Sequence, residues 1–301
     1  MRPDRIITLG LVQPVRRWLD NLGNPTSGQD ERVLPVLMYH SISDDPEPGG
    51  PAFFRLTTPP IRFALHMQWL ADDGCVGVTL SQGLQWLAGR STFSRRPIAI
   101  TFDDGFRDFA VDAVPHLQHH GFLATMYLPT GFMEANSRGF RSRPCLSWEE
   151  ARALQDAGME FGSHTVNHPA LYSLAWEEIA GELNASKDRM EDRLGCRVPH
   201  FAYPYAYPEG DRSFTRTFAA LLRRSGYETS VTTSVGRVGQ QHDVLALRRL
   251  PVNGCDDRRL LRAKLDGAYD WIAGPQIVYK TLRGALSLRP SVRSIKSIGQ
   301  P

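Results

Sequence analysis

The strongest constraint on the fold is a regular alternation, along residues 33–255, of short apolar runs and longer amphipathic segments. The short runs are rich in β-branched residues, which favours strands, whereas the longer segments carry apolar residues at helical spacing. Strands that alternate with helices form a parallel sheet covered by helices. We predict seven strands, at residues 34–39, 98–102, 124–128, 159–162, 200–203, 229–233 and 247–250.

Helix start and stop signals lie between these runs. Ser147 and Glu150 have capping-box spacing, which predicts a helix that begins after Ser147 and ends at Gly158. A longer helix is predicted over 176–194, with Gly195 just beyond its end. Seven strands with six or more helices indicate an α/β fold, a distorted (β/α) barrel rather than an open doubly wound sheet. Further helices are predicted over 63–73, from residue 81, and over 108–120.

The chain divides into three predicted segments. Residues 1–32 are expected to form an N-terminal helical extension and a linker, residues 33–255 the α/β domain, and residues 256–301 a C-terminal helical extension. A net charge of +3 is too small to indicate a nucleic-acid partner. No C-x-x-C pair occurs among the four cysteines, which argues against a zinc ribbon or a disulfide scaffold.

Targeting signals are weak. The apolar run at residues 6–12 is short for a secretory leader and no small-residue cleavage site follows it. No run approaches the roughly 18 apolar residues of a membrane span, so we expect a cytoplasmic protein. The basic run 283–296, with interspersed Leu, Val and Ile, leaves open a peripheral contact with an anionic membrane.

Two polar motifs follow predicted strands. The first, T-F-D-D-G at 101–105, puts adjacent carboxylates at a strand end before a glycine that permits a sharp turn. The second, G-S-H-T-V-N-H at 162–168, spaces His164 and His168 by four, so one helical turn would bring both imidazoles to one side. Two histidines and one carboxylate are a common metal-ligand set that leaves positions open for water and substrate.

These motifs resemble the polysaccharide deacetylases with a NodB-homology domain, carbohydrate esterase family 4. The resemblance covers roughly residues 34–252 and includes F-A-Y-P-Y at 201–205 and L-R-R-L-P-V at 247–252. The opening P-V-L-M-Y-H at 35–40 is similar to the branch that acts on poly-N-acetylglucosamine.

The resemblance implies a role for each matching residue. Asp104, His164 and His168 would hold one divalent metal ion, with zinc expected, and Asp103 would be the general base that activates water. His40 would protonate the departing amine. Pro204 and Tyr205 would face the substrate, and the backbone N–H of Tyr205 would help to hold the oxyanion.

The chain departs from the family pattern at two positions. Ala202 stands where many relatives have an arginine that orients the base, and we hypothesise that Arg249 takes its place. Ala206 stands where a glycine usually follows Pro-Tyr, which would restrict the backbone near the oxyanion site.

The function implied is hydrolysis of the N-acetyl group of a sugar, without a redox cofactor. The substrate would be a bacterial polysaccharide or a glycan precursor, as in exopolysaccharide biosynthesis, and the lack of a clear leader favours a precursor. Two alternatives stay open: hydrolysis of another non-peptide amide on the same scaffold, and a non-catalytic carbohydrate-binding module. The glycan and the oligomeric state do not follow from the sequence.

Overall fold

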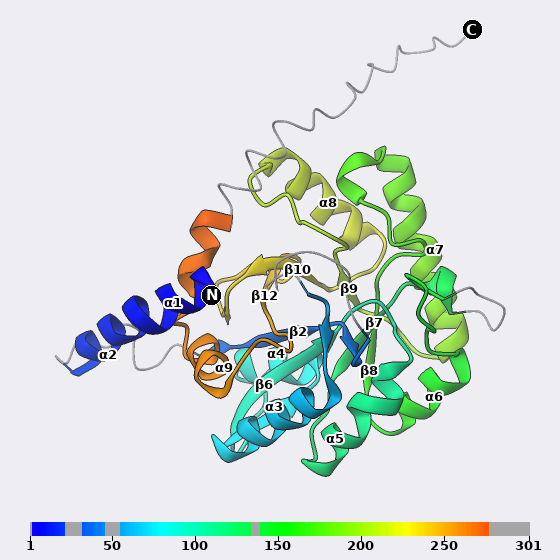
Figure 1. Cartoon of the computed structure of the whole chain (residues 1–301). Coiled ribbons are helices and arrows are strands. Elements are labelled where there is room, and N and C mark those ends of the chain that lie inside the picture. The colour runs from blue at the N-terminus through cyan, green and yellow to red at the C-terminus, as the bar shows by residue number, and fades with distance from the viewer. Residues whose placement is uncertain (1, 22–31, 46–54, 134–138, 277–301) are drawn as a thin grey trace, which may run out of the picture.

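A closed ring of seven parallel strands forms the centre of the protein (Figure 1). The computed structural model describes residues 2–21, 32–45, 55–133 and 139–276. The ring runs β2, β12, β10, β9, β8, β7, β6 and closes where β6 pairs with β2. The predicted (β/α) barrel is confirmed, and each predicted strand overlaps one strand of the ring: β2 (Val36–Tyr39), β6 (Arg96–Phe102), β7 (Thr125–Leu128), β8 (Glu160–Ser163), β9 (His200–Ala202), β10 (Thr229–Val235) and β12 (Leu247–Pro251).

An eighth parallel strand, β5 (Cys75–Val78), was not predicted. It pairs with the first half of β6, outside the closed ring. Gly77 allows this close approach, since a Cβ atom there would lie 2.6 Å from Ile100 Cδ1 and 2.8 Å from Phe122 Cβ. A four-residue run interrupted by glycine carries little strand signal, which is why the sequence did not reveal it. Two short strand pairs complete the sheets: β1 (Val33–Leu34) with β11 (Val238–Gly239), and β3 (Ser41–Ile42) with β4 (Thr57–Thr58).

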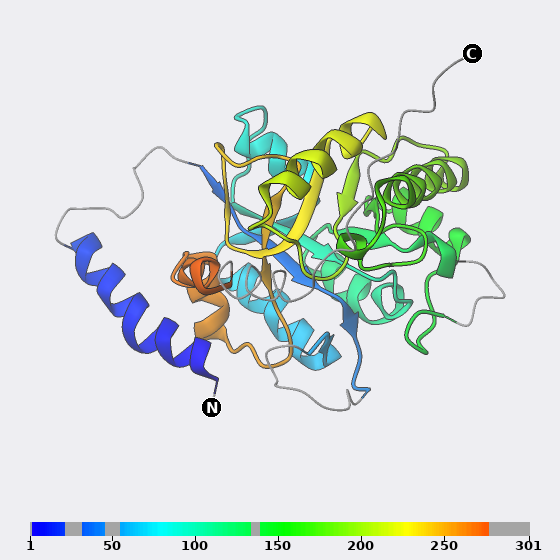
Figure 2. The ribbon, with the colours of Figure 1, turned by 90° about the horizontal axis from the view of Figure 1, so that it is seen from above.

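Helices surround the ring (Figure 2). The predicted capping box is confirmed, because the Glu150 N–H donates to Ser147 Oγ and the Ser147 N–H donates to Glu150 Oε2. Gly195 ends its helix in the left-handed conformation, at φ 65°. The helix predicted over 108–120 begins as a π-helical turn, Phe109–Ala113, ahead of Pro115, which has no N–H to donate. The helices are α3 (Pro60–Asp72), α4 (Leu80–Leu87), α5 (Val114–His119), α6 (Trp148–Asp156), α7 (Trp176–Leu194) and α8 (Arg212–Arg224).

Side chains alternate between the two faces of the ring strands. On β6, Ile98, Ile100 and Phe102 belong to the main core beneath the helices, whereas Ala99 belongs to the cluster inside the ring. That inner cluster is filled with buried apolar side chains, so the barrel is a packed core and not a pore. Because strand side chains repeat with a period of two, the residue directly after β6, Asp103, continues the inward row.

The two ends of the described chain pack on each other. Residues 3–21 form one helical rod made of α1 (Pro3–Ile7), the π-helical turn Thr8–Val12 and α2 (Gln13–Asn21). The start of the rod lies against α9 (Arg258–Leu265) and the segment that follows it. Partly buried polar contacts hold this junction: Arg2 pairs with Asp256 at 3.2 Å, the Tyr269 hydroxyl donates to Asp4 at 2.7 Å and Trp271 Nε1 donates to Thr8 Oγ1 at 3.0 Å.

The described parts of both predicted terminal extensions contain helices, and the division of the chain into these segments stays a prediction. The predicted linker, residues 23–30, and the basic run 283–296 lie outside the described residues. Within the described ranges, no helix combines the length and the apolar character needed to cross a membrane.

Candidate metal and catalytic site

The predicted site residues gather at one face of the barrel. Parallel strands in a barrel end at the same face, so residues that follow different strands meet there. Asp103 and Asp104 follow β6, His164 and His168 follow β8, and His40 follows β2. The other three come from neighbouring segments: Arg249 from within β12, and Pro204 and Tyr205 from just beyond β9.

Asp104, His164 and His168 form a compact buried cluster. Asp104 Oδ1 lies 3.5 Å from His164 Nε2 and 3.2 Å from His168 Nε2. One ligand atom from each residue lies within 4.8 Å of the other two. Burial alone would raise the pKa of Asp104, but the two imidazoles outweigh burial and hold this pKa well below its ordinary value. The cluster therefore presents one carboxylate and two imidazoles to a common point.

The chemistry of these atoms fits a cation. His164 Nδ1 donates to the backbone carbonyl of Ala202 at 2.8 Å, so in the neutral tautomer with this proton Nε2 presents a lone pair toward Asp104. Asp104 Oδ1 is buried and has no hydrogen-bond partner among the described residues. A lone pair that faces a carboxylate oxygen in a buried site is unfavourable unless a positive charge lies between them. These residues therefore fit a metal ion with nitrogen and oxygen ligands.

The turn that carries His164 and His168 differs from the prediction. The sequence suggested one helical turn, but residues 164–168 are not helical. Thr165 and His168 instead adopt left-handed backbone conformations, with φ of 71° and 52°. Asp104 is left-handed as well, at φ 73°. Such conformations are costly for residues other than glycine and gather at functional sites, where the surrounding structure enforces them.

Asp103 is held by Arg249. The guanidinium donates to both carboxylate oxygens, each at 2.7 Å, and both side chains are almost fully buried. Arg249 also donates to the Thr232 carbonyl at 3.0 Å and to Thr101 Oγ1 at 3.2 Å, which fixes its orientation. Burial would raise the pKa of Asp103, but the charge of Arg249 outweighs it and lowers this pKa below its ordinary value. The carboxylate is therefore ionised and fixed in orientation.

The two departures from the family pattern have simple structural consequences. Ala202 is buried on β9 and contributes its backbone carbonyl to His164, while the guanidinium that reaches Asp103 comes from β12. The φ angle of Ala206 is not positive. The left-handed conformation in this turn belongs to the preceding residue, Tyr205, at φ 56°. An alanine at 206 therefore needs no strained backbone conformation.

His40 lies beside Asp103 on the side of β2. Its Nε2 is 3.8 Å from Asp103 Oδ2, and its side chain is 17% exposed. Burial lowers the pKa of His40, although both aspartates act in the opposite direction. A partly accessible imidazole next to the carboxylate is well placed for proton transfer.

Tyr205 forms one wall of the site, directly after Pro204. Its ring lies 4.6 Å from the ring of His168, in an edge-to-face arrangement, and the residue is 47% exposed. No acceptor for the Tyr205 backbone N–H is found in the described part of the chain. This N–H is therefore available to a substrate oxygen.

A second wall of the site, formed by Phe140 and Arg141, was not predicted from the sequence. Phe140 packs against His168 with ring centroids 4.8 Å apart, and the Arg141 guanidinium lies over the rings of Phe140 and Tyr205 at 5.2 and 5.8 Å. No sequence motif marks this segment, because its position depends on a tight turn in which Phe140 and Arg143 exchange backbone hydrogen bonds.

Comparisons with known proteins agree with this geometry. A family model described as polysaccharide deacetylase matches residues 90–230, which include both polar motifs. YxkH of Bacillus subtilis, whose name assigns it to the polysaccharide deacetylases, is 30% identical over 220 residues, which is 73% of this chain and 71% of YxkH.

Two solved structures share the fold. The Streptococcus pyogenes deacetylase PplD, in complex with acetate, superposes with a TM-score of 0.67 at 26% identity, covering 78% of this chain and 98% of PplD. IcaB from Ammonifex degensii superposes with a TM-score of 0.63 at 23% identity, covering 77% of this chain and 96% of IcaB, which supports the fold alone. The barrel, the matched family model and the similarity to YxkH together show that this chain belongs to the polysaccharide deacetylase family and is an enzyme of that family.

Proposed function

We propose that the protein is a metal-dependent hydrolase that removes the N-acetyl group from a sugar of a bacterial polysaccharide or of a glycan precursor. The observation that carries this proposal is the juxtaposition of two sets of groups. Asp104, His164 and His168 converge on one point, and the Asp103–Arg249 pair lies next to them. One set suits a metal ion, and the other suits a fixed general base.

In this proposal Asp104, His164 and His168 hold the metal, with zinc the ion that two imidazoles and one carboxylate suit best. When bound, the ion would polarise the acetyl carbonyl and make a nearby water more acidic. The second nitrogen of His164 is already fixed by the Ala202 carbonyl, and such an outer contact orients a ligating imidazole.

The residues of the chain then supply two proton transfers. Asp103 takes a proton from the attacking water as its oxygen bonds to the acetyl carbon, and Arg249 keeps the carboxylate aligned. The backbone N–H of Tyr205 donates to the developing oxyanion. His40 gives a proton to the nitrogen as the carbon–nitrogen bond breaks, which releases acetate and a free amine.

The sugar substrate is supported by the walls of the site. The half-exposed ring of Tyr205 stands next to His168, where an aromatic face can stack on a sugar ring. Pro204 precedes it and fixes the entry of the chain into this turn. Exopolysaccharide modification is the biological setting that we propose for this activity.

The test is acetate release from N-acetylglucosamine oligomers and carrier-linked N-acetylated sugars, measured together with bound metal. Asp103→Asn should keep the metal and lose acetate release, whereas Asp188→Asn, an exposed aspartate on α7, should behave as wild type. If Asp103→Asn retains full activity, the assigned base is wrong. If the wild type binds metal but releases acetate from none of these sugars, the sugar substrate is wrong.

His40 is tested separately. His40→Ala should lower kcat by about 100-fold, within the range typical of a lost general acid, and leave the metal content unchanged. His119→Ala removes an exposed histidine from α5 and serves as the matched control. Loss of metal from His40→Ala would make His40 a ligand and not an acid.

A further inference from the structure

The helical rod of residues 3–21 presents a stripe of exposed apolar side chains. Ile7, Leu11, Val15 and Trp18 follow one another at spacings of four, four and three, and are 36%, 62%, 47% and 61% exposed. Helical residues at these spacings share one face. Half of the ten large apolar side chains that are exposed in the described chain lie in its first 18 residues. Exposed apolar surface is therefore concentrated on the rod and not scattered.

The first residues of the rod are held against the rest of the protein. Arg2, Asp4, Arg5 and Thr8 make polar contacts to α9 and to the residues on either side of it. Both views show the rod leaving the barrel, with its far end away from the strands (Figures 1 and 2). The stripe therefore runs along a helix that projects from the body of the enzyme.

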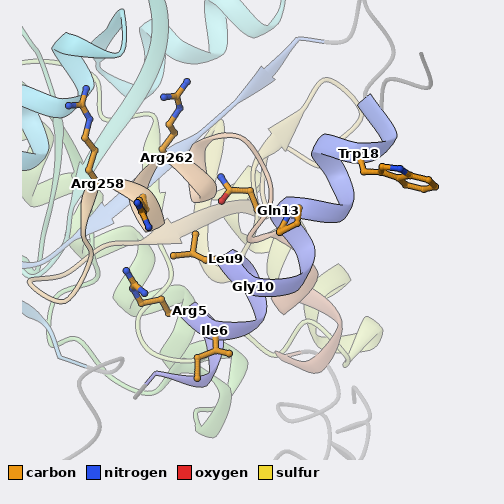
Figure 3. A pocket seen from close by; sticks show the side chains of 10 residues that line it. Arg5, Ile6, Leu9, Gly10, Gln13, Trp18, Arg258 and Arg262 are labelled. Carbon is orange, nitrogen blue, oxygen red and sulfur yellow. The ribbon is translucent and has the colours of Figure 1, made fainter. Parts of the chain in front are cut away.

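Arginines border the rod where it meets α9. A groove of about 1120 Å³ lies between the two helices, and none of the described residues that line it is acidic (Figure 3). Its apolar residues come from the rod, and its cationic residues are Arg5, Arg258, Arg259 and Arg262.

Two of these arginines make no hydrogen-bonded ion pair with a described residue. Arg5 pairs with Asp257, and Arg258 pairs with Asp73 at 2.8 Å. Arg259 makes no ion pair with any described residue, and Arg262 approaches Asp266 only to 3.8 Å. Both lie exposed on α9, three residues apart and thus on one face of that helix.

We propose that the rod and the exposed arginines of α9 form a docking surface for an anionic phospholipid bilayer, with the rod lying in the plane of the interface. Trp18 and the aliphatic residues of the stripe would enter the boundary of the acyl chains, and Arg259 and Arg262 would meet the lipid phosphates. A second copy of the chain fits less well, because two such cationic surfaces repel each other. Four apolar side chains also fall short of the roughly 800 Å² per partner that a stable interface buries.

The experiment is flotation of the full chain with vesicles of phosphatidylcholine plus phosphatidylglycerol, compared with phosphatidylcholine alone. The wild type should float with the anionic vesicles at low salt and lose affinity as salt rises. The double variant Arg259→Gln, Arg262→Gln should bind the anionic vesicles about 25-fold more weakly. This figure assumes that each arginine near the bilayer surface contributes about fivefold to the affinity. The double variant Leu11→Ser, Trp18→Ser should no longer float with the anionic vesicles.

The matched control is Val244→Ser, which removes an exposed apolar side chain from the loop before β12 and should float as the wild type does. Circular dichroism of each variant establishes that the fold is kept. The proposal fails if the wild type does not float with anionic vesicles, or if both double variants float unchanged. It also fails if sedimentation shows that the wild type is a dimer, that the double variant Leu11→Ser, Trp18→Ser is a monomer, and that neither form binds vesicles.

Discussion

The most quantitative prediction that follows from the structure concerns the buried ion pair of Asp103 and Arg249. Arg249→Met removes two charge-assisted hydrogen bonds of 2.7 Å and leaves Asp103 buried without its partner. Removing one member of a buried ion pair costs about 3–5 kcal/mol, because the remaining charge is desolvated and uncompensated. We therefore expect the free energy of unfolding to fall by about that amount. Adding Asp103→Asn to Arg249→Met should recover most of the loss, since no buried charge is then left unpaired.

The neighbouring residue supplies the control. Arg248 pairs with Glu209 at 2.7 Å, but both side chains are partly exposed. Arg248→Met should therefore cost about 1 kcal/mol or less. Urea unfolding of the metal-free protein, followed by circular dichroism, measures the free energy of unfolding of all four forms. If Arg249→Met costs no more than Arg248→Met, the buried pair does not contribute as the structure implies.

Three further predictions concern the metal, the pH response and the packing. Asp104→Ala should abolish tight zinc binding, measured by calorimetry, with circular dichroism unchanged; unchanged affinity would exclude Asp104 as a ligand. His66 is buried between the Tyr39 hydroxyl and the Asp256 carbonyl, and burial lowers its pKa to about 4. Below about pH 6.5 the unfolded chain therefore binds a proton at His66 that the folded chain does not bind. The free energy of unfolding should fall by up to about 3 kcal/mol between pH 6.5 and 4, and His66→Gln should flatten this window; an equal slope in both proteins would contradict the assignment. Gly77→Ala should lower thermal stability by about 1–3 kcal/mol, because the added Cβ would lie 2.6 Å from Ile100 Cδ1; an unchanged melting temperature would show that β5 packs less closely against β6.

The sequence contains most of the information about the candidate metal site. Asp104, His164 and His168 follow strands whose apolar patterns are clear, and parallel strands in a barrel bring their carboxyl ends together. Their proximity could therefore be predicted without coordinates. The form of the turn between the histidines could not, because a spacing of four suits a helical turn as well as the left-handed turn at Thr165 and His168.

Other features depend on contacts between segments that are distant in the sequence. That Arg249 could reach Asp103 was a hypothesis from the sequence, but its bidentate contact depends on β12 closing beside β2 in the ring. Strand β5 was missed because Gly77 interrupts a short run whose stability comes from packing on β6. The wall made by Phe140 and Arg141 has no periodic pattern at all, since one tight turn sets its position.

The most direct test of the proposed chemistry is a zinc titration of metal-free protein in which bound metal and released acetate are measured in the same sample. The wild type should bind one zinc ion per chain and release acetate from an N-acetylglucosamine oligomer in proportion to the bound zinc. Asp103→Asn should give the same binding curve with no acetate above background. Acetate release at full rate by Asp103→Asn, or by wild type freed of metal, would contradict the account.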